Sequence, residues 1–329
     1  MSTVYVCEQG AILKKSGQRI IVTRDRKVLL EIPVFKVQRV LLYGNVQLTS
    51  QAAALLLESG VDVNFLSFTG RMRGKLTSTW SKNILLRLAQ YNRWKDKAFK
   101  SSFAAAVVRG KLKNMRSLLL RFRRNHTEVN FTNALAGIEK TLHQIKNENI
   151  TVENLFGMEG NCSRIYFEAF SIMIRGEMRF RGRNRRPPTD PVNSLLSLGY
   201  TVVSNELVSV LEAMSMDPYL GFYHGLRYGR KSLALDLVEE FRQPLVDTMT
   251  LYMVNKRFFT ADDFEKKPDG ALYLAQEAFK KYFEFYEKRV GGKIEGENRT
   301  WRDIFNRQAK RLEKTIMDGV PYNPYHMNS

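Results

Sequence analysis

The 329-residue sequence has very few cysteines and no long apolar run. Only Cys7 and Cys162 are present. Two cysteines so far apart form neither a disulfide framework nor a zinc knuckle, so a reducing cytoplasm is expected. No stretch approaches the about 18 uninterrupted apolar residues of a transmembrane helix. Residues 1–10 lack the basic segment and apolar run of a signal peptide, so neither secretion nor membrane insertion is expected.

Acidic residues are scarce relative to basic ones. The chain has 33 Asp and Glu against 52 Lys and Arg, a formal charge of +19. Such an excess favours a polyanionic partner, because each Lys or Arg docked on a phosphate releases condensed counterions. From residue 82 to 124, thirteen basic residues accompany one acid, Asp96, and from 175 to 188 six arginines accompany Glu177. A solvated helix face and an arginine-tolerant loop are the alternatives, but such faces usually interleave both signs. Nucleic acid is therefore the expected partner.

Residues 1–76 are predicted to form a small β-rich domain. Short apolar or alternating runs with turn residues between them are typical of strands, and Ser16-Gly17 is a plausible hairpin turn. Thr49 or Ser50 is expected to cap one helix that Gly60 ends. The predicted strands cover residues 4–6, 11–15, 18–23, 28–32, 37–42 and 61–66.

From residue 77 to 329 the pattern predicts a large all-α domain, so the fold class is α+β and multidomain. No proline occurs between Lys82 and Arg186, and apolar residues recur there at helical spacing. Later helices are predicted at 232–241, 271–286 and 300–316. The tail 319–325 is not helical, and it is either frayed or docked.

His224 is the histidine whose context suggests a metal ligand. It lies in a glycine-bearing segment that leads into a predicted helix, on which Asp236 and Glu239 project from one face. That helix is apolar on nearly every side, and two carboxylates in such surroundings are costly unless a cation compensates them. The cation is either a metal ion or an arginine such as Arg230 or Arg242, and helix spacing does not decide between them.

Glu159 is a third candidate ligand. Gly157 and Gly160 flank it at the predicted start of an apolar helix. Its alternative role is favourable electrostatics at a helix N-terminus, worth about 0.3–1 kcal/mol. Nothing in the local sequence brings Glu159 to His224, so that step requires the fold.

Four ordered segments together resemble the CRISPR-associated endonuclease-integrase family that inserts new spacers. The β-rich start, with Leu42-Tyr43-Gly44-Asn45-Val46, is also similar to the N-terminal domain of that family. The segments are Gly157-Met-Glu-Gly160 with Tyr166-Phe167, Arg183 to Tyr200, Gly221-Phe-Tyr-His224, and Arg230 to Arg242.

The resemblance implies that Glu159, His224 and Glu239 bind one divalent ion, with Asp236 beside them as a fourth catalytic residue. Many relatives have Asp where Glu239 stands. Two oxygen ligands and one imidazole favour Mg²⁺ or Mn²⁺ over zinc. The implied reaction is attack of a prespacer 3′-hydroxyl on a phosphodiester of the CRISPR repeat, and with water as nucleophile the same centre cuts DNA. Asp236 then acts as a base or orients His224.

The resemblance also implies partners. Double-stranded DNA, as prespacer and repeat, is expected to be held by Arg183, Arg185, Arg186 and Arg230. The chain is expected to form a homodimer through domain 1–76. The homodimer is expected to bind a small CRISPR adaptation partner protein in a heterohexameric or similar complex. No membrane partner is expected. The residues alone leave two rivals open: a branched-DNA repair nuclease, and a non-catalytic nucleic-acid-binding scaffold in which the acids only form ion pairs.

Overall fold

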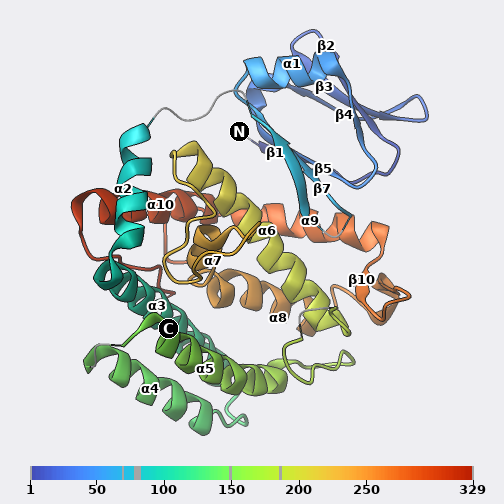
Figure 1. Cartoon of the computed structure of the whole chain (residues 1–329). Helices are drawn as coiled ribbons and strands as arrows, with labels where there is room; N and C mark the ends of the chain where they lie inside the picture. Colours follow the sequence, from blue (N-terminus) through green and yellow to red (C-terminus); the bar gives the residue numbers. More distant parts are fainter. Residues whose placement is uncertain (1, 69, 78–82, 148–149, 185–186, 328–329) are drawn as a thin grey trace. The chain divides into compact units, whose positions relative to one another are not determined.

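The chain forms a β-rich unit and a largely helical unit. One unit comprises residues 1–80 with 275–292, the other 81–274 with 293–329. The predicted fold class is confirmed (Figure 1), while the linear boundary after residue 76 stays a prediction. The computed structural model describes residues 2–68, 70–77, 83–147, 150–184 and 187–327.

Two four-stranded sheets make up most of the first unit. Strand order is β1-β5-β7-β8 in one and β4-β3-β2-β6 in the other. Strand β8 was not predicted, since Gly74 and two basic residues interrupt its apolar pattern. The strands are β1 (Ser2–Val6), β2 (Ile12–Ser16), β3 (Arg19–Arg24), β4 (Lys27–Pro33), β5 (Val37–Tyr43), β6 (Gln47–Leu48), β7 (Asp62–Leu66) and β8 (Met72–Leu76).

The turn and cap residues of the first unit act as the sequence predicts. Gly17, in the β2–β3 turn, has a φ of +56°, a conformation that glycine adopts at little cost. Helix α1 (Ser50–Glu58) begins after Thr49, whose side chain accepts a hydrogen bond from the N–H of Ala52 at 3.3 Å.

Helix α9 (Gln276–Gly291) belongs to the first unit although it lies late in the sequence. Its Phe279 and Phe283 rings lie 5.3 and 4.8 Å from the ring of Tyr43 on β5. The helix predicted over 271–286 was therefore placed too early, because residues 272–274 form a strand instead.

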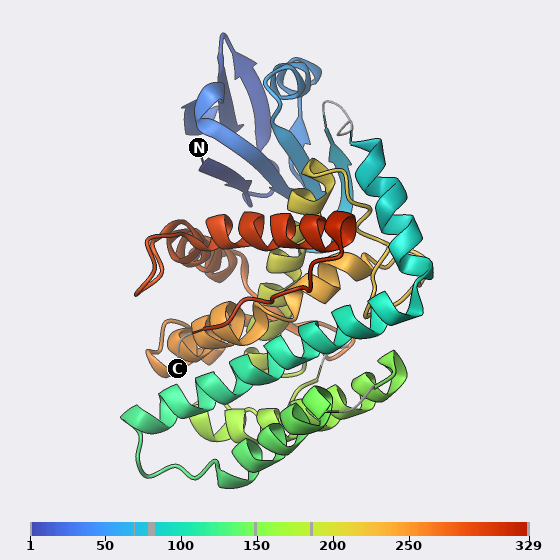
Figure 2. The ribbon, with the colours of Figure 1, turned by 90° about the vertical axis from the view of Figure 1, so that its left-hand side faces the viewer.

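The second unit is built from helices and one short hairpin. Helices α3, α4 and α5 pack side by side (Figures 1 and 2). Helix α6 is long and apolar enough to cross a membrane, but 72% of its most apolar window is buried, as in a core helix. The elements are α2 (Ile84–Lys95), α3 (Lys97–Asn125), α4 (Thr132–Asn147), α5 (Val152–Met173), α6 (Pro191–Ala213), α7 (Ser232–Val238), α8 (Thr248–Asn255), β9 (Phe264–Lys266), β10 (Leu272–Leu274) and α10 (Trp301–Asp318).

Helix α5 begins earlier than the sequence suggests. Thr151 caps it and accepts a hydrogen bond from the N–H of Asn154 at 3.3 Å. Glu159 therefore lies inside the helix, and the expectation that it stands at a helix start was wrong. The cause is that Gly157 and Gly160, read as boundary residues, are helical positions. Helix-start electrostatics is thus excluded as the role of Glu159.

The helix that carries Asp236 ends before Glu239, shorter than the predicted 232–241. A turn follows, and then a π-helix, η2 (Arg242–Asp247). Pro244 explains the break, because it has no N–H to donate to the carbonyl of Glu240. The side-chain amide of Asn114 donates to that carbonyl at 3.0 Å instead. Glu239 is thereby held on a turn and not on a regular helix face.

The C-terminal tail is docked, which decides between the two alternatives left open by the sequence (Figure 2). Asn114 donates to the carbonyl of Tyr325 and accepts from the N–H of Met327, both at 3.0 Å. The buried carboxylate of Glu240 accepts from the hydroxyl of Tyr322 at 2.6 Å and from the N–H of Tyr325. The tail thus fixes the residue next to Glu239.

We expect Tyr322→Phe to destabilise the helical unit, because it removes a hydroxyl donor from the buried carboxylate of Glu240. The cost is about 1–3 kcal/mol for a buried group left without its partner, measured as a lower Tm by calorimetry. Tyr228→Phe is the control, because the Tyr228 ring is fully exposed. Equal Tm values for the two variants would show that the hydroxyl of Tyr322 does not stabilise the docked tail.

Candidate metal centre and nucleic-acid surface

Two glutamates from separate elements share one lysine ammonium. Glu159 lies on α5, Lys111 on α3, and Glu239 directly after α7. The Nζ of Lys111 donates to Oε1 of Glu159 and lies 2.6 Å from Oε2 of Glu239. The side chains of Lys111 and Glu239 are only 4% and 3% exposed, and that of Glu159 is 16% exposed. One cation therefore bridges two carboxylates in a setting with little water.

Glu239 also forms a two-point ion pair with Arg242. The Nε of Arg242 donates to Oε2 at 2.8 Å and its Nη2 donates to Oε1 at 2.9 Å. The guanidinium lies 4.4 Å from the ring centroid of Tyr200, a cation–π contact. The pairing with Arg242 that the sequence left open is thus present for Glu239.

Asp236 has a different environment, which is made of backbone N–H groups. Its Oδ2 accepts from the N–H of Phe222 at 2.7 Å and of Tyr223 at 3.0 Å, and its Oδ1 accepts from the N–H of His224 at 2.8 Å. Oδ1 also lies 2.8 Å from Nδ1 of His224. An ionised carboxylate can only accept, so this contact places the ring hydrogen on Nδ1. The lone pair is then on Nε2.

The second ring nitrogen of His224, Nε2, lies beside Glu239. Nε2 is 3.6 Å from Oε1 of Glu239. The imidazole also lies 5.9 Å from the ring of Phe156, which is on α5 like Glu159. Gly221 permits this arrangement, since a Cβ there would lie 2.6 Å from Cβ of Ser232. Only glycine lets the segment before His224 pass so close to the start of α7.

The charges around the glutamates keep both of them ionised. Burial alone raises the pKa of Glu239, but Arg242 and Lys111 outweigh it and lower that pKa below its usual range. Burial also raises the pKa of Glu159, and Lys111 with a hydrogen bond from Ser163 brings it below its usual value. Two ionised carboxylates beside an imidazole lone pair are a suitable donor set for a divalent cation.

A second buried carboxylate, Asp247, orients the tyrosine ring that Arg242 contacts. Asp247 accepts from the hydroxyls of Tyr166 at 2.7 Å and Tyr200 at 2.5 Å. Burial raises the pKa of Asp247 to about 6, opposed by the two hydroxyl hydrogen bonds and by Arg242. The network fixes the Tyr200 ring on which the guanidinium lies. Sequence reasoning missed Asp247, because its partners come from other helices.

The four side chains predicted as the site, Glu159, His224, Asp236 and Glu239, lie together. Among the described residues, however, no three His, Cys, Asp or Glu side chains converge closely enough, as they stand, to hold a metal ion. The ammonium of Lys111 fills the position between the two glutamates.

Lys111 does not lie on the exposed basic face that the sequence predicts. It was counted with the surface residues of the 82–124 segment, but it is buried. The signal that identifies it is its setting, because Val107 and Met115, one turn before and after it, are buried apolar residues. A lysine on an apolar helix face requires a buried acidic partner.

Other basic residues of that segment contact the backbone or line a hollow. Arg87 and Arg93 donate to backbone carbonyls at 3.1 and 3.0 Å, so they serve the fold. Arg109 and Lys113 line a hollow of about 540 Å³ on the side where the tail docks. The other basic or imidazole side chains around this hollow are His143, Lys146 and His326.

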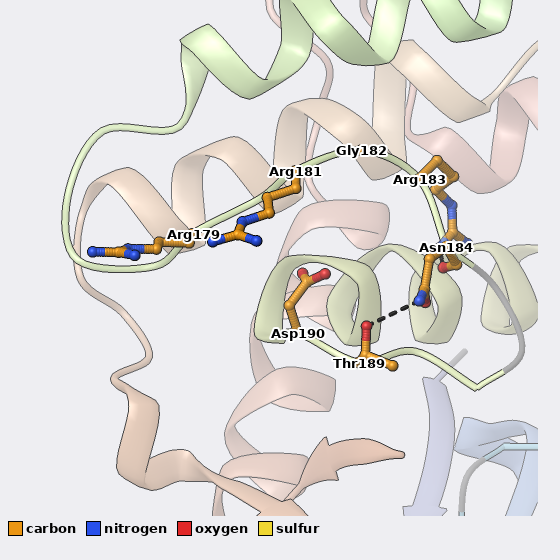
Figure 3. A pocket seen from close by; sticks show the side chains of 7 residues that line it. All are labelled: Arg179, Arg181, Gly182, Arg183, Asn184, Thr189 and Asp190. Atoms are coloured by element: carbon orange, nitrogen blue, oxygen red, sulfur yellow. Dashed lines mark hydrogen bonds between the residues drawn. The ribbon is translucent and has the colours of Figure 1, made fainter. Parts of the chain in front are cut away.

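The structure describes four arginines in the loop between α5 and α6, and three of them, Arg175, Arg179 and Arg181, are exposed. Arg175 pairs with Glu128. Arg183 donates to Oδ1 of Asn193 at 2.7 Å and to Oγ of Ser197 at 3.0 Å, which ties the loop to α6. Arg179 and Arg181 are exposed and line a hollow of about 510 Å³ (Figure 3). Figure 3 also shows the hydrogen bond between Asn184 and Thr189 on the opposite side.

Arg230 is the one described residue among the remaining predicted DNA contacts. Arg230 is half-buried, near the start of α7. Arg185 and Arg186 lie outside the described residues. The DNA role of all four predicted arginines stays a prediction, and Arg183 has in addition the structural contacts given above.

Comparison with known proteins shows the family of this chain. The family profile described as CRISPR associated protein Cas1 matches residues 4–288. A CRISPR-associated endonuclease Cas1 of Thermus thermophilus is 36% identical over 334 residues, which cover 99% of this chain and 97% of that protein. In a solved Cas6-RT-Cas1–Cas2 complex, one chain matches with a TM-score of 0.84 and 25% identity, over 100% of this chain and 36% of that chain.

A casposase bound to an integration product also shares the fold. It matches with a TM-score of 0.84 over 100% of this chain and 96% of that chain, at 20% identity. The family, fold and function predicted from the ordered motifs are confirmed by the near full-length match to the curated relative. This chain belongs to the Cas1 family of CRISPR-associated proteins, the endonuclease-integrases of spacer acquisition.

Proposed function

We propose that Glu159, His224 and Glu239 bind one Mg²⁺ or Mn²⁺ ion and that this centre cuts and joins DNA. The observation that carries the proposal is the contact of two ionised glutamates with a single cation, the ammonium of Lys111. These glutamates are far apart in sequence, and ordinary packing has no need to bring two like charges to one point.

The residues fit such an ion in their chemistry. Carboxylate oxygens and one imidazole suit a hard divalent cation, whereas zinc prefers thiolates and more histidines. Lys111 stands in for the positive charge between the glutamates. Nε2 of His224, 3.6 Å from Glu239, supplies the nitrogen donor.

When bound, such an ion lowers the pKa of the attacking hydroxyl and neutralises charge on the phosphorus oxygens. Asp236 holds Nδ1 of His224 so that Nε2 is directed to the site. Both oxygens of Asp236 already accept hydrogen bonds, so we assign it as a positioning residue and not as a base. Arg242 keeps Glu239 ionised.

The reaction exchanges one phosphodiester for another. The 3′-hydroxyl oxygen of a prespacer bonds to phosphorus in the CRISPR repeat, and the bond from phosphorus to the departing 3′-oxygen breaks. The proton of the attacking hydroxyl is lost and the departing oxygen gains one, so atoms and charge balance. Water in place of the hydroxyl gives hydrolysis, which accounts for endonuclease activity at the same centre.

The named structural relatives support the partners that we propose. One is a complex that contains Cas2, and another is bound to an integration product. For this chain we infer double-stranded DNA, as prespacer and repeat, a homodimer, and a small partner of the Cas2 kind in a heterohexameric or similar complex. We place the activity in the cytoplasm, where the free cysteines Cys7 and Cys162 stay reduced.

We extend the proposed DNA surface beyond Arg183, Arg185, Arg186 and Arg230. The exposed Arg179 and Arg181 project from the loop that begins at the end of α5, the helix that carries Glu159. Their guanidinium groups suit bidentate contact with phosphate.

Removing any one proposed ligand should abolish most of the chemistry. For Glu159→Gln, Glu239→Gln and His224→Ala we expect about 10³-fold or greater loss of Mn²⁺-dependent cleavage and strand joining, because a metal ion supplies several kcal/mol to the transition state. Glu168→Gln, an exposed change on the same helix as Glu159, should retain activity. Full activity in all three ligand variants would refute the site.

Asp236→Asn tests positioning separately from ligation. We expect Mn²⁺ affinity to fall about 10–100-fold, since the carboxylate that orients His224 is lost. Raising the Mn²⁺ concentration should then restore much of the cleavage rate in Asp236→Asn but not in Glu159→Gln. A loss that no Mn²⁺ concentration repairs, with Tm unchanged, would instead make Asp236 a direct participant.

DNA affinity should depend on salt through the exposed arginines. We expect log K to fall linearly with log salt, and the double variant Arg179→Gln, Arg181→Gln to reduce the slope by about 1.8, or about 0.9 per lost phosphate contact. Arg164→Gln is the control, because Arg164 is exposed and paired with Glu168 on α5. A slope that is the same in wild type and double variant excludes these contacts.

A further inference from the structure

Lys111 is a buried cation for which the proposed chemistry has no role so far. Its Nζ contacts Glu159 and lies 2.6 Å from Glu239. The site contains three carboxylates, Glu159, Asp236 and Glu239, against two basic side chains, Lys111 and Arg242. One net negative charge remains with His224 neutral, so the site still favours additional positive charge.

Lys111 and a divalent ion require the same carboxylate oxygens. Mg²⁺ binds oxygen at about 2.0–2.1 Å, and the ammonium already lies within hydrogen-bond distance of both glutamates. Two cations on the same oxygens repel each other strongly where little water screens them. An ion held by Glu159 and Glu239 therefore excludes the ammonium from the position between them.

The backbone of Lys111 is fixed, so only its side chain can respond. Asn114, one turn further along α3, is bonded to the carbonyls of Glu240 and Tyr325 and to the N–H of Met327. The ammonium is a compact charge with rotatable donors on a flexible four-carbon stem. It can leave the glutamates, but it stays within reach of the same site.

We propose that Lys111 is an exchangeable counter-ion. Without a divalent ion it holds Glu159 and Glu239 together, and when the ion binds it leaves them and contacts a phosphate oxygen of the DNA backbone. The inference rests on the proposed metal site and adds to it a residue that the site ligands do not include. Lys111 then lowers the affinity for the ion, because it competes for the same glutamates. It raises the cleavage rate, because it stabilises negative charge on the phosphodiester.

Mn²⁺ binding to the full chain without DNA tests the competition. Free Mn²⁺ is measured by its electron paramagnetic resonance signal for wild type, Lys111→Met and Lys140→Met. We expect Lys111→Met to bind Mn²⁺ about 10-fold more tightly, because the competing charge is gone. Lys140→Met, the same change at an exposed site on α4, should bind as wild type does. Equal or weaker Mn²⁺ affinity in Lys111→Met overturns the proposal.

DNA cleavage at saturating Mn²⁺ tests the proposed contact of Lys111 with phosphate. Lys111→Met should lose about 10²-fold in rate although its site is filled, since the cation near the phosphate is missing. Its Tm in EDTA should also fall below that of wild type, while its Tm rises more on addition of Mn²⁺. Undiminished cleavage at saturating Mn²⁺ would overturn the phosphate role.

Failure of the metal site itself is distinguishable from failure of this inference. If wild type and Glu159→Gln both bind no Mn²⁺, the proposed function fails and the inference fails with it. If wild type binds Mn²⁺ at Glu159 but Lys111→Met does so no more tightly, only the inference fails. Should Lys111→Met not fold, a crystal structure of wild type with Mn²⁺ decides. Nζ displaced from the glutamates supports the proposal, and Nζ still bridging them overturns it.

Discussion

Three buried or nearly buried carboxylates must be neutralised within one small region of the helical unit. An uncompensated charge in such a place costs several kcal/mol, so the surrounding elements are arranged to supply positive partners. Lys111 reaches Glu159 and Glu239 from α3, Arg242 pairs with Glu239, and backbone N–H groups satisfy Asp236. The same convergence of negative charge that the fold must compensate makes the region a binding place for a divalent cation.

The backbone geometry of this region depends on partners from distant parts of the chain. Pro244 cannot donate to the carbonyl of Glu240, and Asn114 donates to it instead. The same amide binds the C-terminal tail, whose Tyr322 donates to the Glu240 side chain. Asn114 thus connects the backbone at the proline break to the docked tail. This connection holds Glu239 at the point where Lys111, on the same helix as Asn114, can reach it.

The sequence predicted features whose causes are local, and it failed where partners come from elsewhere. Thr49 caps α1 as expected. Asp236 lies on α7 as expected, whereas Glu239 lies on the turn after that helix and not on the predicted helix face. The family was identified because its four motifs are ordered and specific.

Lys111 looked like a surface cation because the acid that neutralises it is on another helix. The start of α5 was misplaced because Gly157 and Gly160 suggest a boundary, although helical packing tolerates both. Tail docking could not be predicted, since its acceptors are a buried asparagine and a buried glutamate far earlier in the chain.

The two cations that contact Glu239 differ in whether they can leave. Arg242 binds both oxygens of one carboxylate with a planar guanidinium, lies on Tyr200, and has that ring fixed by Asp247. Removing it breaks two hydrogen bonds and a cation–π contact together. Lys111 bridges two carboxylates through a single nitrogen at the end of a flexible four-carbon stem. An arriving divalent ion offers both glutamates more charge than the ammonium does, whereas it offers nothing that replaces the two-point contact of the guanidinium. Exchange at the lysine and permanence at the arginine therefore follow from the shapes of the two side chains.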